Sequence, residues 1–496
     1  MTSMSEALVV GSSWSILIRW TSRFLGIISL AVCARILTPA DYGLVNMAMV
    51  IVAFSAILVE FGIDASLIRE QNPTKETYNT AWSLRIIQSL IVATIVIVAS
   101  PIAASLYKDP RVIPIMIAVA VAGLIGGMQN IYVVLYRKTL NFRSDFVLSI
   151  LPKIASFTAA IVSVLLLKSY WGLVIGICVA ELSKVLVSYV MMPKRASWSL
   201  SEWRSLTSFS GWYFLKGVGD FFTYEFDRFL VGTLAGPRQT GLYAVGKEIA
   251  SLPATEIILP IGRALLPTLS RIVDERERFG LAVEKAIVGT LILTAPAAVG
   301  FALIAPEFVQ LLFGSGWKEA VILVTIFSIG SIFSGFKVTV ANVLLITGKI
   351  RTNALISWIQ AGLALGFFYP AYLMGGTEGI AVLYVVVGIL TCLMYGFILH
   401  FSRLVNTASL LKGIARPLIA SVLMYLFAVW LIQYLNISAS LILLVAKMLI
   451  GVLAYSAFLA ILWLLAGSPR SSERVIASIL YDKIEALMLR KFSARS

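Results

Sequence analysis

Residues with side chains suited to metal binding or covalent catalysis are scarce in this chain. Its 496 residues include one histidine and three cysteines. Cys33, Cys178 and Cys392 lie far apart inside apolar segments, and His400 stands alone near the end of another. Metal sites and disulfides need such residues in groups or pairs. We therefore expect no metal site, no disulfide and no cofactor.

Motifs of ATP-driven transport and of sugar transfer are also missing. Residues 345–350 contain Gly-Lys without the upstream glycine and the following Ser or Thr that cradle phosphate in a P-loop. No Asp-x-Asp motif for a glycosyltransferase metal occurs, and every loop predicted outside the membrane is too short for a polysaccharide polymerase. We therefore expect neither direct use of ATP nor enzyme activity.

Charged residues make up only 13% of the chain, whereas hydrophobic residues make up 59% and the mean hydropathy is +0.93. Apolar runs long enough to cross ~30 Å of hydrocarbon as a helix recur along nearly the whole sequence. The chain is therefore predicted to be an all-α polytopic membrane protein. Because the chain is predicted to lie in a membrane, its net charge of +15 does not indicate nucleic-acid binding.

Apolar length, Gly and Pro positions and interfacial aromatic residues predict fourteen membrane-spanning helices. Their approximate ranges are 12–35, 43–63, 81–106, 112–136, 147–167, 171–192, 209–234, 241–266, 283–313, 319–346, 352–374, 379–401, 414–434 and 440–466. Lys and Arg are far more frequent in the even-numbered loops and the C-terminal tail than in the odd-numbered loops. Because basic loops stay on the cytoplasmic side, both termini are predicted to be cytoplasmic.

Two loop sequences indicate an internal duplication. In each of them a proline precedes, by four residues, the glycine that opens the next helix: Pro39 with Gly43, and Pro237 with Gly241. Two further matches follow in the same order at an offset of about two hundred residues: 61–69 with 261–271, and 100–107 with 305–313. Since the first span matches the seventh, the membrane orientation is the same, which predicts two parallel six-helix repeats with a shared cavity between them.

The duplication divides the chain into four predicted parts. These are an N-terminal six-helix bundle (1–200), a C-terminal six-helix bundle (201–405), two additional spans (406–466) and a cytoplasmic amphipathic tail (467–496). In the tail, an apolar stripe is flanked by Lys483, Arg490 and Lys491, as in a helix lying on an anionic inner leaflet. A docking helix for a polymerase or synthase partner is the alternative.

Several basic residues fall inside the predicted spans. A lipid-facing Arg or Lys at mid-depth costs roughly 2.5 to 3.5 kcal/mol, so these side chains are expected to face protein or water. In the first span, Arg19 and Arg23 share a stripe of small and polar residues spaced three and four apart. The predicted cavity cations are Arg19, Arg23, Arg85, Lys216, Arg228 and Lys337. Because Arg matches phosphate oxygens in a bidentate manner, they suit an anionic headgroup taken up from the cytoplasm.

Intramembrane acids are candidates for coupling transport to a proton or sodium gradient. They are Asp220, Glu225, Asp227 and Glu248. Structural roles stay open for part of these charges. Lys216 with Asp220, and Tyr224 with Arg228, have the spacing of pairs that only brace helices. Some basic residues near the cytoplasmic ends of predicted spans have side chains long enough to reach lipid headgroups. They are Lys153 and Lys285 above all, and also Arg19 and Arg85.

The segment 34–70 joins a span end, a Leu-Thr-Pro-x-x-Tyr-Gly turn and a second span that ends in Phe-Gly-x-x-x-Ser-Leu-Ile. With the Phe-Gly-x-x-Trp turn in 311–321, it resembles the polysaccharide transporter (Wzx/RfbX-like) branch of the multidrug/oligosaccharidyl-lipid/polysaccharide flippase superfamily. The resemblance covers most of residues 10–400. A total of fourteen spans departs from the twelve common in that family and resembles its longer exopolysaccharide members and the lipid II flippases.

The resemblance implies a V-shaped pair of bundles that flips undecaprenyl-diphosphate-linked oligosaccharide across a bacterial inner membrane by alternating access. It also implies basic residues along the lumen, matched by location for Arg19 and Arg23 and by repeat position for Lys216 and Arg228. Polysaccharide polymerase or export machinery would be a partner. A cation-coupled multidrug exporter of the same fold is the alternative function, although its cavity would need the opposite charge.

Overall fold

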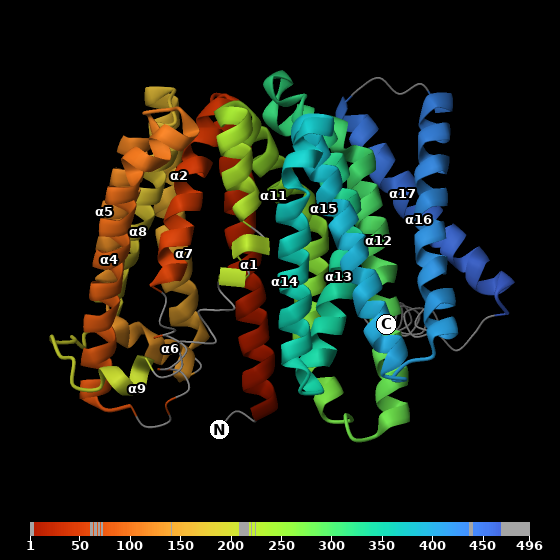
Figure 1. The fold of residues 1–496 in the computed structure, drawn as a ribbon, viewed down its shortest axis with the longest axis horizontal. Coiled ribbons are helices and arrows are strands. Elements are labelled where there is room, and N and C mark those ends of the chain that lie inside the picture. Colours follow the sequence, from red (N-terminus) through yellow and green to blue (C-terminus); the bar gives the residue numbers. More distant parts are fainter. Residues whose placement is uncertain are drawn as a thin grey trace, which may run out of the picture. The chain divides into compact units, whose positions relative to one another are not determined.

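The computed structural model describes residues 4–467 except 60–62, 64–66, 68–69, 71–72, 140, 208–217, 220, 224 and 436–439. This part of the chain is helical and contains no strand, which confirms the predicted all-α class (Figure 1). Its helices are α1 (Met4–Ala34), α2 (Pro39–Leu58), α4 (Lys75–Tyr107), α5 (Val112–Gly127), η1 (Ile131–Val133), α6 (Val134–Lys138), α7 (Phe142–Leu167), α8 (Trp171–Met191), α9 (Trp203–Thr207), α11 (Phe226–Ser270), α12 (Arg276–Phe313), η2 (Ser315–Trp317), α13 (Ala320–Ile346), α14 (Ile350–Gly366), α15 (Phe368–Phe401), α16 (Thr407–Leu435) and α17 (Ser440–Leu465).

Within the described ranges, eleven helices are long and apolar enough to cross a membrane. The number is twelve if Val112–Gly127 and Ile131–Lys138, which meet at an angle of 67°, form one broken span. The protein is therefore a multi-pass membrane protein. The total of fourteen stays a prediction, because the seventh predicted span, 209–234, falls partly outside the described residues.

Two of the long helices are interrupted where the sequence predicts the end of a span. α11 has a non-helical residue at Gly236, with φ of 74°, between the predicted spans 209–234 and 241–266. α15 has non-helical residues at Gly375 and Gly376, between the predicted spans 352–374 and 379–401. Gly236 and Gly376 have positive φ, which glycine adopts without the Cβ clash that other residues suffer. Each continuous helix thus holds parts of two predicted spans, which lowers the helix count.

The turn before α2 has the sequence features of a strong helix start. Thr38 and Asp41 form a reciprocal capping box, in which the Thr38 hydroxyl accepts from the Asp41 N–H and the Asp41 carboxylate accepts from the Thr38 N–H at 2.9 Å. Pro39 occupies the first helical turn, where its missing N–H has no intrahelical role. The Leu-Thr-Pro-x-x-Tyr-Gly segment therefore sets the position of α2 locally.

The two matching turns of the predicted duplication lie against each other. A methyl group added to Gly43 would overlap the carbonyl oxygen of Pro237 and lie 3.0 Å from the nitrogen of Gly241. A methyl group added to Gly241 would overlap the carbonyl oxygen of Pro39 and lie 3.0 Å from the nitrogen of Gly43. The contact is reciprocal, as expected for related turns, and requires glycine on both sides because backbone meets backbone.

The described chain forms two compact units. The first comprises residues up to Ala244 together with Leu312–Trp317, and the second comprises the remainder from Val245. The start of α11 therefore belongs to the first unit, whereas the sequence divides the bundles near residue 200. In the first unit, α2, α4, α5 and α8 share an apolar core that includes the buried Leu44, Met47, Val96, Ile115 and Val174.

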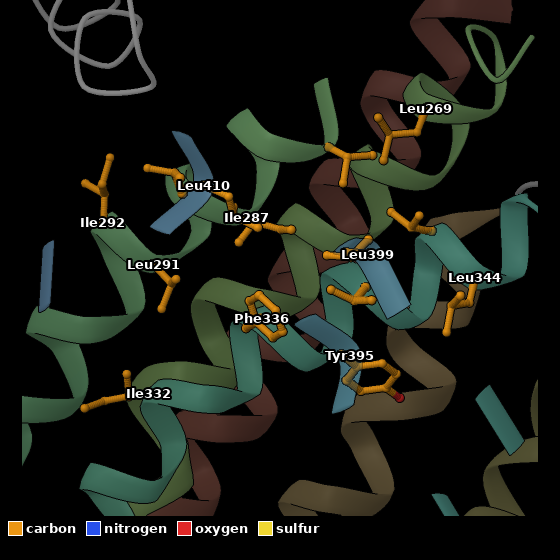
Figure 2. Close-up of a cluster of buried hydrophobic side chains, with 14 of the residues drawn as sticks. Leu269, Ile287, Leu291, Ile292, Ile332, Phe336, Leu344, Tyr395, Leu399 and Leu410 are labelled. Atoms are coloured by element: carbon orange, nitrogen blue, oxygen red, sulfur yellow. The ribbon is translucent and has the colours of Figure 1, made fainter. Parts of the chain in front are cut away.

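The core of the second unit lies between α12, α13 and α15. Figure 2 shows Ile287 of α12, Phe336 of α13 and Leu399 of α15 within this cluster. Tyr395 contributes its ring to the core, while its hydroxyl donates to Oδ1 of Asn353 at 2.7 Å. The polar end of a buried tyrosine is thus satisfied without opening the apolar core.

The last two spans, α16 and α17, pack within the second unit and also run beside each other (Figure 1). Met424 of α16 and Tyr455 of α17 share a small buried cluster with Val299 of α12. The Tyr455 hydroxyl donates to the carbonyl oxygen of Ile292 at 2.7 Å. Although these spans lie outside the sequence duplication, they are attached to α12 by buried contacts.

Candidate functional site

Arg19 and Arg23 are both half-buried side chains on α1. The most exposed side of this helix carries large apolar residues, among them Trp20 at 63% and Phe24 at 67% exposure. The two arginines therefore lie beside this apolar face rather than at its centre. Neither lines the two first-unit cavities described next, to which α1 contributes Ile18. Their predicted role as cavity cations stays a prediction.

Arg85 lies where two cavities of the first unit meet. The cavities have volumes of about 420 and 530 Å³ and share Arg85 of α4 with Glu181 and Lys184 of α8. We name this pair of cavities the basic chamber. Nζ of Lys184 is 3.2 Å from Oε2 of Glu181, a spacing of one helical turn. The structure thus brings the predicted candidate Arg85 together with two charged residues of α8 that were not among the predicted cavity cations.

Lys153 of α7 also lines the basic chamber, near Ser149 and Ser156. Its position near the cytoplasmic end of a predicted span favours a side chain that reaches out to headgroups, but in the structure it contributes to a cavity wall. No local sequence pattern indicates that Lys153 and Arg85 line the same cavity. Their shared position depends on the close packing of α7 against α8.

Arg228 has a nearby acidic partner at the start of α11. Its Nη1 is 3.1 Å from Oε2 of Glu225, three residues earlier. Asp227 accepts a hydrogen bond of 2.8 Å from the hydroxyl of Tyr243, whose side chain is fully buried. Arg228 is therefore a charge-compensated cation, and Asp227 is held by a tyrosine that sequence reasoning did not single out.

Two predicted site residues, Lys216 and Asp220, lie outside the described residues. The predicted pair between them and the pair of Tyr224 with Arg228 consequently stay predictions. Glu248 is exposed on α11. Among the described residues, no group of three or more His, Cys, Asp or Glu side chains is placed to hold a metal ion.

Lys337 of α13 shares an aromatic partner with a second lysine. Its Nζ lies 6.0 Å from the ring centre of Tyr384, and Nζ of Lys247 lies 5.3 Å from the same ring. Cations at this distance are attracted by the negative face of an aromatic ring. The structure therefore gathers two cations from α11 and α13 at one tyrosine of α15. Lys247 was not among the predicted cavity cations.

The second unit also contains a large apolar groove. Its volume is about 770 Å³, and its walls come from α11, α12, α16 and α17, with Pro296, Gly300, Met448 and Gly451 among the lining residues. One polar feature interrupts this lining. Nζ of Lys447 lies 2.7 and 2.8 Å from the two carboxylate oxygens of Glu307 and 3.1 Å from the carbonyl oxygen of Leu303. The groove thus pairs an apolar surface with a compensated charge at its wall.

Comparison with known proteins places these features in context. The chain matches the family described as "Polysaccharide biosynthesis protein" over residues 32–322. It is 23% identical over 430 residues to the succinoglycan biosynthesis transport protein ExoT of Rhizobium meliloti (strain 1021), covering 85% of this chain and 86% of that protein.

Two solved structures share the fold. One is the lipid II flippase MurJ in an inward closed conformation, with a TM-score of 0.72, 15% identity and coverage of 91% of this chain and 98% of that chain. The other is an inward-facing multidrug resistance MATE family transporter of the MOP superfamily, with a TM-score of 0.60, 15% identity and coverage of 79% and 96%. Since the family match spans more than half of the sequence, this chain belongs to the family of polysaccharide biosynthesis proteins.

Proposed function

We propose that this protein is a flippase. It moves undecaprenyl-diphosphate-linked oligosaccharide from the cytoplasmic to the periplasmic leaflet of a bacterial inner membrane, for the assembly of exopolysaccharide or lipopolysaccharide. The observation that carries the proposal is the presence, in one multi-pass chain, of cationic side chains within the spans and of an apolar groove. A lipid-linked diphosphate presents the complementary surfaces, an anionic head and a long apolar tail.

The cations support the head-binding part of this proposal. Arg23, Arg85 and Lys337 all lie in helices long and apolar enough to span a membrane. Arg and Lys form charge-assisted hydrogen bonds with phosphate oxygens, and these are strongest where water is largely excluded. Arg19, Lys216 and Arg228 complete the proposed set. The proposed cycle alternates access of this set between the two sides of the membrane.

The groove supports the tail-binding part. Its walls are almost entirely apolar, and its volume of about 770 Å³ is in the range of sites that hold sizeable ligands. A polyprenyl chain in the groove would replace the bilayer's own acyl chains at little cost, because both environments are apolar. This gives the last two spans, α16 and α17, a proposed role in guiding the tail.

Ion coupling, orientation and protein partners belong to the same proposal. Asp227 and Glu225 are the described acids closest in sequence to Arg228, and they join Asp220 and Glu248 as candidates for coupling to protons or sodium. Both termini are proposed to be cytoplasmic, on the basis of the loop charges. Polymerase or export machinery is the proposed protein partner.

The relatives' names agree with the flippase function, since ExoT is a succinoglycan biosynthesis transport protein. The similarity to a multidrug resistance transporter shows a shared fold, which by itself does not distinguish the two functions. The predicted charges within the spans, six basic against four acidic, favour an anionic substrate over the organic cations of a drug exporter.

The test is a deletion strain in which lipid-linked glycans are extracted and assigned to a leaflet. Loss of the flippase is expected to trap undecaprenyl-linked glycan on the cytoplasmic leaflet and to abolish surface polysaccharide. Expression of the wild-type chain restores both. If the deletion leaves polysaccharide unchanged and instead removes efflux of a cationic fluorescent dye, the exporter is the correct function.

A further inference from the structure

A loop that joins the sixth and seventh predicted spans lies on α4 through hydrogen bonds. We name residues 193–204 the linker loop. In it, the N–H of Ser197 donates to Oδ1 of Asn79 at 2.9 Å, and the N–H of Ser199 donates to Oγ of Ser83 at 3.0 Å. Positions 79 and 83 are about one helical turn apart, roughly 6 Å along the axis, and two residues of extended chain cover about the same distance. The loop therefore runs extended along α4, in the direction of the helix, from Ser197 to Ser199.

The linker loop then turns back toward the start of α4. The N–H of Glu202 donates to Oγ1 of Thr80 at 3.4 Å, and the hydroxyl of Thr74 donates to Oε1 of Glu202 at 3.1 Å. α9 follows directly and also packs against α4 (Figure 1). The contact with Ser83 is the furthest along α4 of these hydrogen bonds, which makes residues 198–200 the tip of the loop. Since Ser83 lies within the third predicted span, the tip lies at the depth where that span begins.

The tip presents apolar side chains that the protein leaves exposed. Trp198 is 59% exposed and Leu200 is 40% exposed. Because alternate residues of an extended chain point to the same side, these two side chains form one apolar face. Tryptophan is enriched at membrane–water interfaces, where its ring contacts the apolar region and its N–H contacts the polar one. A backbone fixed on α4 therefore presents Trp198 and Leu200 at the depth of a membrane interface.

Basic residues stand on both sides of the tip. They are Lys194 and Arg195 before it and Arg204 after it, against a single acid, Glu202. The charged group of each basic residue lies 4.8 to 6.0 Å from the centre of an aromatic ring. In the part of the chain that the structure describes, none of the three forms an ion pair with a carboxylate. Aromatic rings attract cations without neutralising them, so the linker loop carries an excess of positive charge.

We propose that the linker loop anchors the first unit in the interface of the cytoplasmic leaflet and binds anionic lipid headgroups there. Trp198 and Leu200 lie between the headgroups and the acyl chains, while Lys194 and Arg204 contact the phosphates of anionic lipids. Basic segments at a membrane surface are attracted to an anionic leaflet, and apolar side chains that enter the interface strengthen the attachment. The proposal rests on the predicted cytoplasmic position of this loop. It is independent of the flippase function and of the cations within the spans.

Spin labels test the position of the tip. The full-length chain, with Cys33, Cys178 and Cys392 replaced by alanine, receives one new cysteine and is reconstituted in phospholipid vesicles. Leu200→Cys places a nitroxide label on the apolar face, and Ser197→Cys, an exposed position on the opposite side of the extended chain, is the matched control. Molecular oxygen concentrates in the hydrocarbon, whereas a neutral nickel complex stays in water. The label at position 200 is expected to show a higher ratio of oxygen to nickel collisions than the label at position 197.

The lipid dependence tests the charges. The label at position 200 is measured in vesicles of phosphatidylcholine alone and in vesicles with equal parts of phosphatidylcholine and phosphatidylglycerol, where the collision ratio is expected to rise. Lys194→Gln and Arg204→Gln are each expected to lower the ratio of inserted to uninserted loop in the anionic vesicles by roughly fivefold, as for one charge near an anionic surface. Trp198→Ala is expected to lower it in both kinds of vesicle. Lys318→Gln removes an exposed charge from a predicted external loop and, as the matched control, should leave it unchanged.

Two precautions separate a lost lipid contact from a disturbed loop. Arg195 is left in place, because its Nη1 also donates to the carbonyl oxygens of Tyr189 and Met192, at 3.2 and 2.6 Å, and its loss would alter the loop itself. Circular dichroism and size-exclusion profiles establish that each variant is folded.

Equal collision ratios at positions 197 and 200 would overturn the proposal and would favour a loop that faces water or a protein partner. An absent effect of phosphatidylglycerol, or equal losses in Lys194→Gln and Lys318→Gln, would overturn it as well. Modification of Ser197→Cys by an impermeant maleimide in intact cells would place the loop outside the cytoplasm and have the same consequence. The flippase function is judged separately, by the polysaccharide of the deletion strain.

Discussion

The indole nitrogen of Trp317 donates a hydrogen bond of 2.9 Å to the carbonyl oxygen of Ala34, the last residue of α1. Tyr42 of α2 packs edge-on against the same indole ring, with the ring centres 5.3 Å apart. Trp317 is only 1% exposed. The tryptophan of the Phe-Gly-x-x-Trp turn therefore joins residues 312–317 to the turn between α1 and α2. This contact explains why these residues belong to the first unit although the rest of α12 does not.

Replacing Trp317 with Phe tests this bond. The aromatic contact with Tyr42 can persist, but the carbonyl of Ala34 loses its buried donor, which is expected to cost ~1–3 kcal/mol of stability. Thermal unfolding of the purified protein, followed by size-exclusion chromatography, measures the change. Trp198→Phe is the control, because Trp198 is 59% exposed and should change stability little. Equal midpoints for the two variants would contradict the assignment.

The crossing of Gly43 and Gly241 predicts that alanine is not tolerated at either position. Each added methyl group would meet a backbone carbonyl that cannot move independently, so each variant should lose at least ~1–3 kcal/mol. Gly26→Ala on α1 is the matched control, because no atom lies within 4 Å of the added methyl position. It should be neutral or slightly stabilising. The same unfolding assay applies, and a stable Gly43→Ala protein would show that the turns can separate freely.

The pair of Lys447 with Glu307 predicts strong coupling between α17 and α12. The side chains are 13% and 12% exposed, so removing one partner leaves a buried charge alone. Lys447→Met is expected to cost ~3–5 kcal/mol, whereas the double variant Lys447→Met/Glu307→Gln should recover most of the loss. A double-mutant cycle of thermal unfolding measures this coupling. Additive losses would mean that the two side chains act independently.

The loop between α4 and α5 predicts a dependence on pH. Arg111 donates side-chain hydrogen bonds of 3.0 and 2.7 Å to the carboxylate of Asp109 and thereby lowers the pKa of Asp109 below its ordinary value. A lowered pKa contributes stability above the pKa of the unfolded chain, about 4, and this contribution is lost as the pH falls through the folded value. The stability difference between wild type and Asp109→Asn should therefore shrink below about pH 4. A constant difference down to pH 2.5 would argue against the ionic contact.

Arg23 provides the test of the proposed substrate cations. Arg23→Gln is expected to abolish polysaccharide export in a deletion strain without lowering the amount of protein in the membrane. Export is quantified as extracellular polysaccharide, and membrane abundance by immunoblot. Lys75→Gln, which removes an exposed charge at the start of α4, should export normally. Normal export from Arg23→Gln would refute the role proposed for this residue.

Much of the fold follows from local sequence features. The all-helical membrane class follows from apolar runs, and the breaks at Gly236 and at Gly375–Gly376 occur where Gly-rich segments predict the ends of spans. The match of Pro39–Gly43 with Pro237–Gly241 predicts related turns, and the structure places those turns in contact. These features depend on hydrophobicity, turn chemistry and backbone freedom over a few residues, so they can be read directly from the chain.

The charged site is less predictable. Helical phase identifies Arg19 and Arg23 as polar positions within an apolar span, because a single helix determines which of its residues share a face. It does not tell which helices become neighbours. The basic chamber depends on the packing of α4, α7 and α8, and the meeting of Lys247 with Lys337 at Tyr384 depends on α11, α13 and α15.

By itself, the sequence determined that this protein crosses the membrane repeatedly, and it predicts duplicated turns and cations within the spans. Only the tertiary structure decided which charged side chains meet between helices: Glu307 with Lys447, and Lys247 with Lys337 at Tyr384. The physical reason is the distance along the chain over which each effect acts. Apolar transfer energies and helix periodicity act along a segment, whereas a contact such as that of Glu307 with Lys447 exists only once distant helices have packed together.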